Sequence, residues 1–323
     1  MLRYFMLLPV ALAPSAWCDT TYAGSRACAG CHQAIYSTYL RSAMGQSLTR
    51  AEQPAQLALA PVPVAVGRFK VFRRGDRLYQ SETEIGQFGN VIGENTFPLE
   101  YVLGSGVNGY SYIVVRGNRL MEAPLSYYSK SKKWDFSPGY ETAGHGFERP
   151  VGAACAACHS GRAQPVPNRL GMYQYPPFLE MAIGCENCHG PGGQHAAGGS
   201  KAAIVNPAKL PPGERERRCG ECHQDPQARP DTDLLAHMSS MRLSKCYRSS
   251  SGRLTCTTCH DPHTTVSAAD SPAYYRSKCL TCHTDESCSL PAHGPACAEC
   301  HMPKRALRVI PHTALTNHRI PAR

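Results

Sequence analysis

Seven Cys-x-x-Cys-His motifs carry the chemistry that this sequence of 323 residues is able to perform. We number them motifs 1 to 7 in chain order. Their cysteines are Cys28 and Cys31, Cys155 and Cys158, Cys185 and Cys188, Cys219 and Cys222, Cys256 and Cys259, Cys279 and Cys282, and Cys297 and Cys300. The histidines that follow are His32, His159, His189, His223, His260, His283 and His301. Paired thiols followed directly by an imidazole are typical of covalent haem c attachment, with thioethers to the vinyl groups and the histidine as an axial iron ligand.

The repetition of this motif excludes a chance pattern. With 17 Cys and 14 His in the chain, only about 0.04 such motifs are expected at random. Zinc ribbons also use Cys-x₂-Cys pairs, but zinc does not require a histidine directly after the second cysteine. A disulfide scaffold would spread its cysteines to join distant segments. The sequence therefore predicts seven covalently attached haem c groups.

The motifs are unevenly spaced along the chain. From first cysteine to first cysteine, 127 residues separate motif 1 from motif 2, whereas 18 to 37 residues separate the later neighbours. So little chain between motifs predicts that the later porphyrins are packed closely together. We expect four segments: a signal peptide over 1–18, an N-terminal single-haem segment over 19–60, a haem-free antiparallel β subdomain over 61–140 and a six-haem array over 141–323.

The long gap after motif 1 has the patterning of β-structure. An Ala/Pro-rich linker is expected over 51–63, and Arg-Gly-Asp at 74–76 is a turn signal. Strands are expected over 67–72, 77–83, 110–116, 119–123 and 124–128. After residue 140 we expect little regular structure, with helices over 234–243 and after each motif. The predicted fold class is irregular and haem-cored, with short α-helices and loops around packed c-type haems and a small antiparallel β subdomain.

The N-terminus and the charge bear on location and partners. Arg3 followed by an apolar stretch over 4–13 is typical of a signal peptide, and no later run reaches the roughly 18 apolar residues of a membrane span. A periplasmic or extracellular, cell-surface location is therefore expected. The formal net charge of +10 would fall to about −4 once seven haems add about 14 propionate charges, so we expect no nucleic-acid partner.

The remaining histidines are candidates for the second axial position of each iron. Besides the motif histidines the chain contains seven, which are His145, His195, His237, His263, His293, His312 and His318. A bis-histidine iron carries electrons, whereas an open position can bind a substrate. His195 follows a glycine-rich turn after motif 3, and His263 is too close to motif 5 to reach the opposite face of the same iron. Both are expected to serve a neighbouring haem.

Three further side chains are singled out by the sequence. Met44 is an alternative distal ligand for motif 1, or else a core residue. Cys246 and Cys288 lie outside the motifs in the mature chain. In an oxidising compartment they are expected to form a disulfide, and two free buried thiols are the alternative.

Several stretches resemble the multihaem c-type cytochrome family related to cytochrome c554, some members of which are fused to tetratricopeptide repeats. The clearest are CENCHGPGGQH at 185–195 and CTTCHDPH at 256–263. Others are the stretches 28–36, 42–44, 101–106, 134–140, 204–209, 300–304 and 317–320. The resemblance covers nearly all of the mature chain and implies covalent haem c, a periplasmic or cell-surface location and electron transfer. The tetratricopeptide array is absent here.

Three classes of function fit these observations. The first is a multihaem electron carrier rather than an enzyme, with redox partners such as a quinol-oxidising membrane complex or other cytochromes. The second is a reductase or oxidase of a small nitrogen or sulfur compound at one open haem. The third is an oligomer, as a subunit of an extracellular cytochrome filament. The number of open axial positions separates the first two classes, and the state of assembly separates the third.

Overall fold

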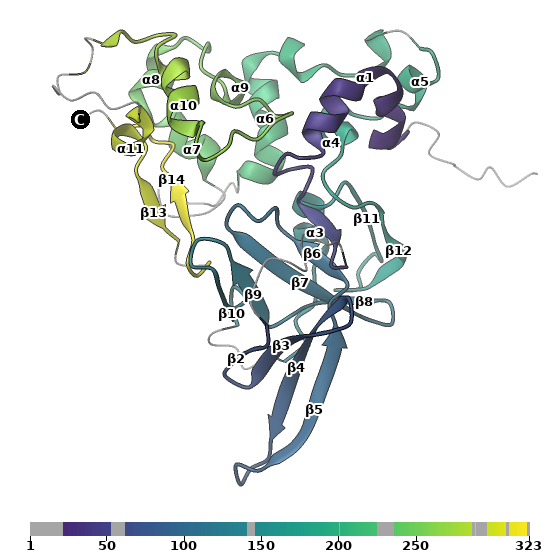
Figure 1. Cartoon of the computed structure of the whole chain (residues 1–323). Coiled ribbons are helices and arrows are strands. Elements are labelled where there is room, and N and C mark those ends of the chain that lie inside the picture. The colour runs from purple at the N-terminus through teal and green to yellow at the C-terminus, as the bar shows by residue number, and fades with distance from the viewer. Residues whose placement is uncertain are drawn as a thin grey trace, which may run out of the picture.

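The computed structural model describes residues 22–52, 62–140, 146–199, 201–224, 236–285, 288, 296–307 and 310–321. The expected signal peptide, most of the expected linker and the candidate ligands His145 and His293 lie outside these residues. Figure 1 shows the larger sheets gathered in one half of the molecule and most helices in the other. The chain begins in the helical half, passes through the sheets and returns to the helices.

A four-stranded antiparallel sheet forms the part of the β half that is farthest from the helices (Figure 1). Its strands are β2 (Val64–Val66), β3 (Phe69–Arg74), β4 (Arg77–Ile85) and β5 (Val91–Pro98), and they are hydrogen-bonded in that order. The β3–β4 hairpin turns through Gly75 and Asp76, with Arg74 opposite Arg77. Gly75 has a φ of 55°, a left-handed conformation that a two-residue hairpin turn requires and that glycine adopts without strain.

A second antiparallel sheet lies between the first sheet and the helices. Its strands are β1 (Leu48–Arg50), β6 (Tyr101–Leu103), β7 (Gly109–Arg116), β8 (Arg119–Glu122), β9 (Leu125–Tyr128) and β10 (Lys133–Phe136). The order is β1-β6-β7-β9-β10, with β8 paired to β7. Side chains from both sheets form one core that includes Val71, Leu78, Tyr112 and Trp134. Each fully buried side chain of this size stabilises the fold by roughly 1.5–3 kcal/mol.

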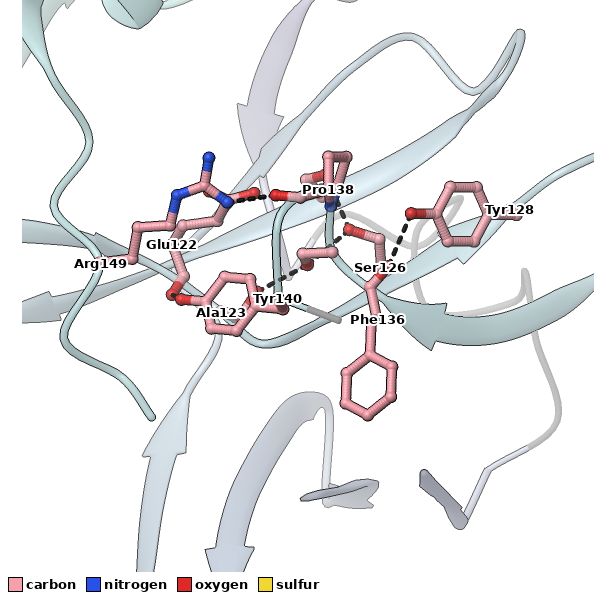
Figure 2. Close-up of polar contacts among 10 residues, drawn as sticks. Glu122, Ala123, Ser126, Tyr128, Phe136, Pro138, Tyr140 and Arg149 are labelled. Carbon is pink, nitrogen blue, oxygen red and sulfur yellow. Dashed lines mark hydrogen bonds and ion pairs between the residues drawn. The ribbon is translucent and has the colours of Figure 1, made fainter. Parts of the chain in front are cut away.

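A hydrogen-bonded chain of serines fixes the segment that leaves β10 (Figure 2). The Ser126 hydroxyl lies 2.7 Å from the hydroxyl of Ser137, which donates to the carbonyl of Ala123 at 2.7 Å. The Tyr140 hydroxyl donates to the Glu122 carbonyl at 2.7 Å. Because these groups are buried, pairing them avoids the desolvation cost of an orphaned polar atom. The network therefore holds the chain against β8 and β9 where it leaves the sheet.

Short helices make up the other half of the molecule. The α-helices are α1 (Ser25–Tyr39), α3 (Ala153–His159), α4 (Cys185–His189), α5 (Gly193–Ala196), α6 (Pro212–His223), α7 (His237–Arg242), α8 (Lys245–Ser249), α9 (Cys256–Cys259), α10 (Ser271–Cys279) and α11 (Cys297–His301). Two 3₁₀ turns are η1 (Lys201–Ala203) and η2 (Pro207–Lys209). Most are too short to be stable alone, so tertiary contacts must hold them.

Two small hairpins connect the halves. Strands β11 (Arg162–Pro165) and β12 (Tyr173–Glu180) pair next to α3, and β13 (Lys304–Ala306) pairs with β14 (Ala314–Thr316) near the C-terminus. A second apolar cluster joins Leu48 and Ile113 of the sheet to Ala156 of α3 and Phe178 of β12. The β half therefore supports the helix that carries motif 2. None of the helices in the described ranges is long and apolar enough to cross a membrane.

The predicted mixture of short helices and antiparallel sheet is confirmed, but its details differ. Five predicted strands correspond to β3, β4, β7, β8 and β9. The sequence reasoning missed β5, whose residues VIGENTFP include a glycine, a glutamate, an asparagine and a proline that disfavour strands. It also missed β11 to β14, which contradict the expectation of little regular structure after residue 140. The predicted helix over 234–243 is observed as α7.

Candidate haem-binding site

Each motif lies on, or at the end of, a short helix. Motifs 3 and 7 coincide with α4 and α11, motifs 2 and 4 end α3 and α6, motif 1 lies inside α1, motif 5 begins α9, and motif 6 begins at the last residue of α10. Residues three and four apart share one helix face, so one helical turn points both thiols and the histidine in the same direction. The motif spacing itself explains this local geometry. The helices expected after the motifs are observed after motifs 1 and 3, as the rest of α1 and as α5, but motifs 2 and 7 are followed by strands β11 and β13 and, within the described residues, no helix directly follows motif 5. Most residues after motifs 4 and 6 lie outside the described ranges.

Motif 1 lies beside motif 3 although 157 residues separate Cys28 from Cys185 in sequence. The thiols of Cys28 and Cys185 are in hydrogen-bond contact. Glu186, a buried residue of motif 3, accepts hydrogen bonds from the backbone N–H groups of Ala23 at 2.9 Å, Gly24 at 2.7 Å and Gly192 at 2.6 Å. One carboxylate therefore anchors the start of α1 to α4.

Motif 4 occupies the centre of the arrangement. Its thiol Cys222 is in hydrogen-bond contact with Cys158 of motif 2, and its thiol Cys219 is in hydrogen-bond contact with Cys256 of motif 5. Cys188 of motif 3 also lies close to Cys219. Three motifs therefore surround α6.

Motifs 5, 6 and 7 continue the row. Cys259 lies close to Cys282 of motif 6, and Cys279 is in hydrogen-bond contact with Cys297 of motif 7. The spatial order of the attachment motifs is therefore 1, 3, 4, 5, 6, 7, with motif 2 beside motif 4. Motif 1, distant in sequence, becomes one end of this row.

Two motif histidines face a distant histidine with nearly parallel rings. The ring centres of His32 and His195 are 6.3 Å apart with an interplanar angle of 22°. Those of His189 and His263 are 6.1 Å apart, also at 22°. A metal–imidazole bond of about 2.0–2.1 Å, plus about 1.1 Å from nitrogen to ring centre, gives about 6.3 Å between the centres of two imidazoles on opposite faces of one metal. Both pairs therefore fit the two axial ligands of one iron.

Two further motif histidines have similar partners. His223 and His237 have ring centres 5.9 Å apart at 64°, and His260 and His318 have centres 6.2 Å apart at 37°. Four of the seven motif histidines thus face a histidine outside the motifs at the spacing that bis-histidine ligation needs.

Backbone carbonyls fix the orientation of several of these rings. His189 Nδ1 lies 2.9 Å from the Val205 carbonyl oxygen, and His318 Nδ1 lies 3.0 Å from that of Thr316. His301 Nδ1 lies 3.3 Å from the Pro321 carbonyl. A carbonyl only accepts, so each Nδ1 carries the proton and Nε2 keeps its lone pair. Histidines that bind metals usually make this second hydrogen bond.

Burial keeps the central histidines neutral. Burial, together with neighbouring His318, His223 and His260, lowers the pKa of His237 from 6.5 to about 3. Burial also lowers the pKa of His318 to about 4, assisted by nearby His260. A neutral imidazole is the form that binds a metal. These rings therefore need not lose a proton to act as ligands at neutral pH.

The other candidate ligands lie elsewhere. His312 Nε2 pairs with Asp135 Oδ2 at 2.7 Å and its ring packs edge-on against Tyr128 at 5.0 Å, so His312 does not face a motif histidine. Met44 lies on the turn after α1 and is partly buried, whereas His195 is the side chain that faces His32. Ring contacts between a motif histidine and a non-motif histidine are seen for motifs 1, 3, 4 and 5 in the part of the chain that the structure describes.

Neither expectation about the two cysteines outside the motifs is fully met. The disulfide expected between Cys246 and Cys288 is not formed, and both thiols are free. The alternative of two free buried thiols is also not met, because Cys246 is only partly buried and Cys288 is exposed. Cys246 lies near Cys259 and Cys279, between motifs 5 and 6.

Motif 2 is held by residues that the sequence gave no reason to select. The Ser47 hydroxyl donates to the His159 carbonyl at 2.8 Å and accepts from the Ile183 N–H at 3.0 Å. Burial lowers the pKa of His159, with His223 nearby lowering it further. Ser47 lies next to β1, so it links the second sheet directly to this motif.

Comparison with known proteins gives structural but not sequence relatives. No family model matches the chain, and no curated protein sequence matches it. The crystal structure of outer cell wall cytochrome OcwA has a TM-score of 0.53 and 16% identity, covering 93% of this chain and 79% of that chain. An undecahaem cytochrome from the S-layer of Carboxydothermus ferrireducens has a TM-score of 0.43 and 17% identity, covering 87% of this chain and 44% of that one. The chain therefore resembles the outer cell wall cytochrome in its fold.

Proposed function

We propose that this protein is an exported multihaem c-type cytochrome that transfers electrons. The observation that carries this proposal is the set of four motif histidines that each face a distant histidine at 5.9 to 6.3 Å. The motifs supply the thiols for attachment, and the facing histidines supply the second axial ligand. Haem c bound in this way provides reversible one-electron Fe(III)/Fe(II) chemistry.

The residues have separate roles in this proposal. The fourteen motif cysteines attach seven groups, and the motif histidines form the first axial ligands. His195, His263, His237 and His318 form the second ligands at motifs 1, 3, 4 and 5, respectively. We therefore replace Met44 by His195 as the ligand opposite His32 and remove His312 from the ligand set. Two strong ligands at motifs 1, 3, 4 and 5 would leave no open position for a substrate at these four sites, which favours a carrier over an enzyme.

The arrangement of the motifs supports a continuous path. Cysteines of neighbouring motifs lie close together along the row, and those of motifs 1 and 3, 4 and 5, and 6 and 7 are in hydrogen-bond contact. We propose that the order 1, 3, 4, 5, 6, 7 is the main row and that motif 2 forms a branch at motif 4. The packing of α3 on the sheet and the hydrogen bond from Ser47 to the His159 carbonyl make motif 2 the site nearest the β half.

Location and partners follow from the same proposal. A periplasmic or cell-surface position suits covalent haem c, and the fold resembles that of a cytochrome described as outer cell wall. Partners are then redox proteins, such as a quinol-oxidising membrane complex or other cytochromes. A filament of copies of this chain is the alternative form of assembly.

The haem count tests the proposal. The full chain is expressed in an oxidising compartment with a cytochrome c maturation system, and the intact mass is measured under denaturing conditions. We expect seven covalently bound haems, and six in the double variant Cys28→Ser, Cys31→Ser. A mass equal to that of the bare polypeptide, together with stoichiometric zinc, would overturn the proposal in favour of a zinc protein.

A further inference from the structure

We propose that His312 and Asp135 form a positioning clamp that docks the β13–β14 hairpin onto the β half and thereby holds His318 opposite His260. The proposal rests on the proposed function, because it takes His318 as an axial ligand. Neither residue touches the motifs. Both act through the hairpin that joins them to His318.

The hairpin is a rigid connector. Its ladder pairs Lys304 with Thr316 and Ala306 with Ala314. At the turn end, the Leu307 N–H donates to the Thr313 carbonyl at 3.0 Å. At the base, the Asn317 N–H donates to the Pro303 carbonyl at 3.2 Å, and the Asn317 side chain is buried. A paired ladder moves as one body, so the position of its turn determines the position of its base.

The turn end of the hairpin contacts the β9–β10 hairpin. His312 Nε2 and Asp135 Oδ2 are 2.7 Å apart, and the His312 ring packs against Tyr128. Lys130 Nζ donates to the Ala314 carbonyl at 3.1 Å. In Figure 1, β13 and β14 run from the helical half to the ends of β9 and β10. The contacts join residues 177 positions apart in sequence.

The base of the hairpin ends at the centre of the motif row. His318 follows β14 by two residues, and its Nδ1 is fixed by the Thr316 carbonyl at 3.0 Å. Its ring faces His260 at 6.2 Å. Because the hydrogen-bond partner of His318 belongs to β14 itself, any displacement of the hairpin displaces the imidazole.

Nearby lysines explain why an acidic residue is needed where the β13–β14 hairpin contacts the β9–β10 hairpin. Lys130 lies close enough to Lys304 for the two cations to repel each other, and Lys133 is also on β10. Asp135 is the anion that His312 meets. His312 also has a φ of 54°, a left-handed conformation that residues other than glycine rarely adopt. The contacts of its side chain offset that strain.

The rate of CO binding tests the clamp. CO must wait for a distal histidine to leave the reduced iron, so weaker docking of the hairpin should speed the reaction at one haem. We expect His312→Ala and Asp135→Ala each to raise that rate about fivefold, as loss of a partly exposed hydrogen bond to a carboxylate allows. The double variant should match the single variants. Asp76→Ala, in the exposed β3–β4 turn, should leave the rate unchanged.

A second readout does not depend on the haem. Hydrogen exchange of the Leu307 and Asn317 amides should become faster in His312→Ala and Asp135→Ala and stay at the wild-type rate in Asp76→Ala. Unchanged exchange and unchanged CO kinetics in a six-coordinate protein overturn the clamp alone. Faster hydrogen exchange with unchanged CO kinetics would show that the contact between the β13–β14 and β9–β10 hairpins does not position His318. This result also overturns the proposal. A wild-type protein without bound haem overturns the proposed function instead.

Discussion

The imidazole rings of His237 and His318 lie 4.7 Å apart and nearly perpendicular, at 79°. His237 also faces His223 of motif 4, and His318 faces His260 of motif 5. One ring comes from α7 and the other from the end of the described chain, so distant segments supply touching side chains. This contact joins the facing histidines of motifs 4 and 5, so a substitution of either ring should affect one axial position and disturb the other.

Replacing His237 or His318 should open one iron. In His237→Ala or His318→Ala, the remaining motif histidine has no imidazole opposite it, so one haem should become high-spin and bind CO when reduced. Electron paramagnetic resonance of the oxidised protein measures the change. If neither variant gains a high-spin signal over the wild type, these histidines are not the ligands of motifs 4 and 5.

His195 and Met44 give opposite expectations at motif 1. His195 faces His32, so His195→Ala should produce one high-spin haem. Met44→Leu keeps the volume of the side chain and should leave every signal low-spin. A methionine ligand also raises the potential, so redox titration of both variants checks the assignment. A fall in potential in Met44→Leu would assign the iron to Met44 instead.

The motifs were predictable from the sequence because their chemistry is local. Two thiols and an imidazole within five residues need only one turn of helix to point the same way. The distal ligands were not predictable in this sense. His195 lies after motif 3 but faces motif 1, and only the contact between α1 and α4 reveals it. His312 looked equivalent to His318 in sequence, yet the two lie at opposite ends of β14, so that one meets Asp135 and the other faces His260.

The strands also divide into those that could be predicted from the sequence and those that could not. Strands β3, β4 and β7 carry dense apolar or β-branched residues and were predicted. Strand β12 contains Pro176 and Pro177, which argue against a strand. It forms in a two-stranded sheet, where both strands are edges and the N–H that proline lacks is not needed for a second partner, and its register is irregular. Packing of Phe178 in the second apolar cluster then outweighs the local preference.

Glu186 should be important for stability rather than for ligation. Its carboxylate accepts three backbone hydrogen bonds, from Ala23, Gly24 and Gly192. Glu186→Ala leaves these donors without that partner, and we expect a loss of about 3 kcal/mol in the free energy of unfolding. Denaturant titration of the holoprotein measures it. Glu214→Gln, at an exposed position of α6, is the matched control and should change stability by less than about 0.5 kcal/mol. Equal effects would contradict the anchoring role.

Glu122 should make stability depend on pH. Burial raises the pKa of this carboxyl to about 7 from an ordinary 4.5, although Arg149, 3.3 Å away (Figure 2), lowers it. Between pH 4.5 and 7 the folded protein then binds more protons than the unfolded chain, so stability falls as pH rises through this window and levels off above it. The fall attributable to Glu122 should be on the order of 3 kcal/mol. Glu122→Gln should flatten the profile in this window, and an unchanged profile would show that Glu122 is ionised throughout.

The most direct test of the account is low-temperature electron paramagnetic resonance of the oxidised holoprotein, joined to CO titration of the reduced form. Bis-histidine ligation predicts low-spin signals from the irons of motifs 1, 3, 4 and 5 and no CO binding at these four. Variants at His195, His263, His237 and His318 assign each signal to its motif. High-spin signals from those irons in the wild-type protein would contradict the bis-histidine arrangement and favour a reductase or oxidase with an open site.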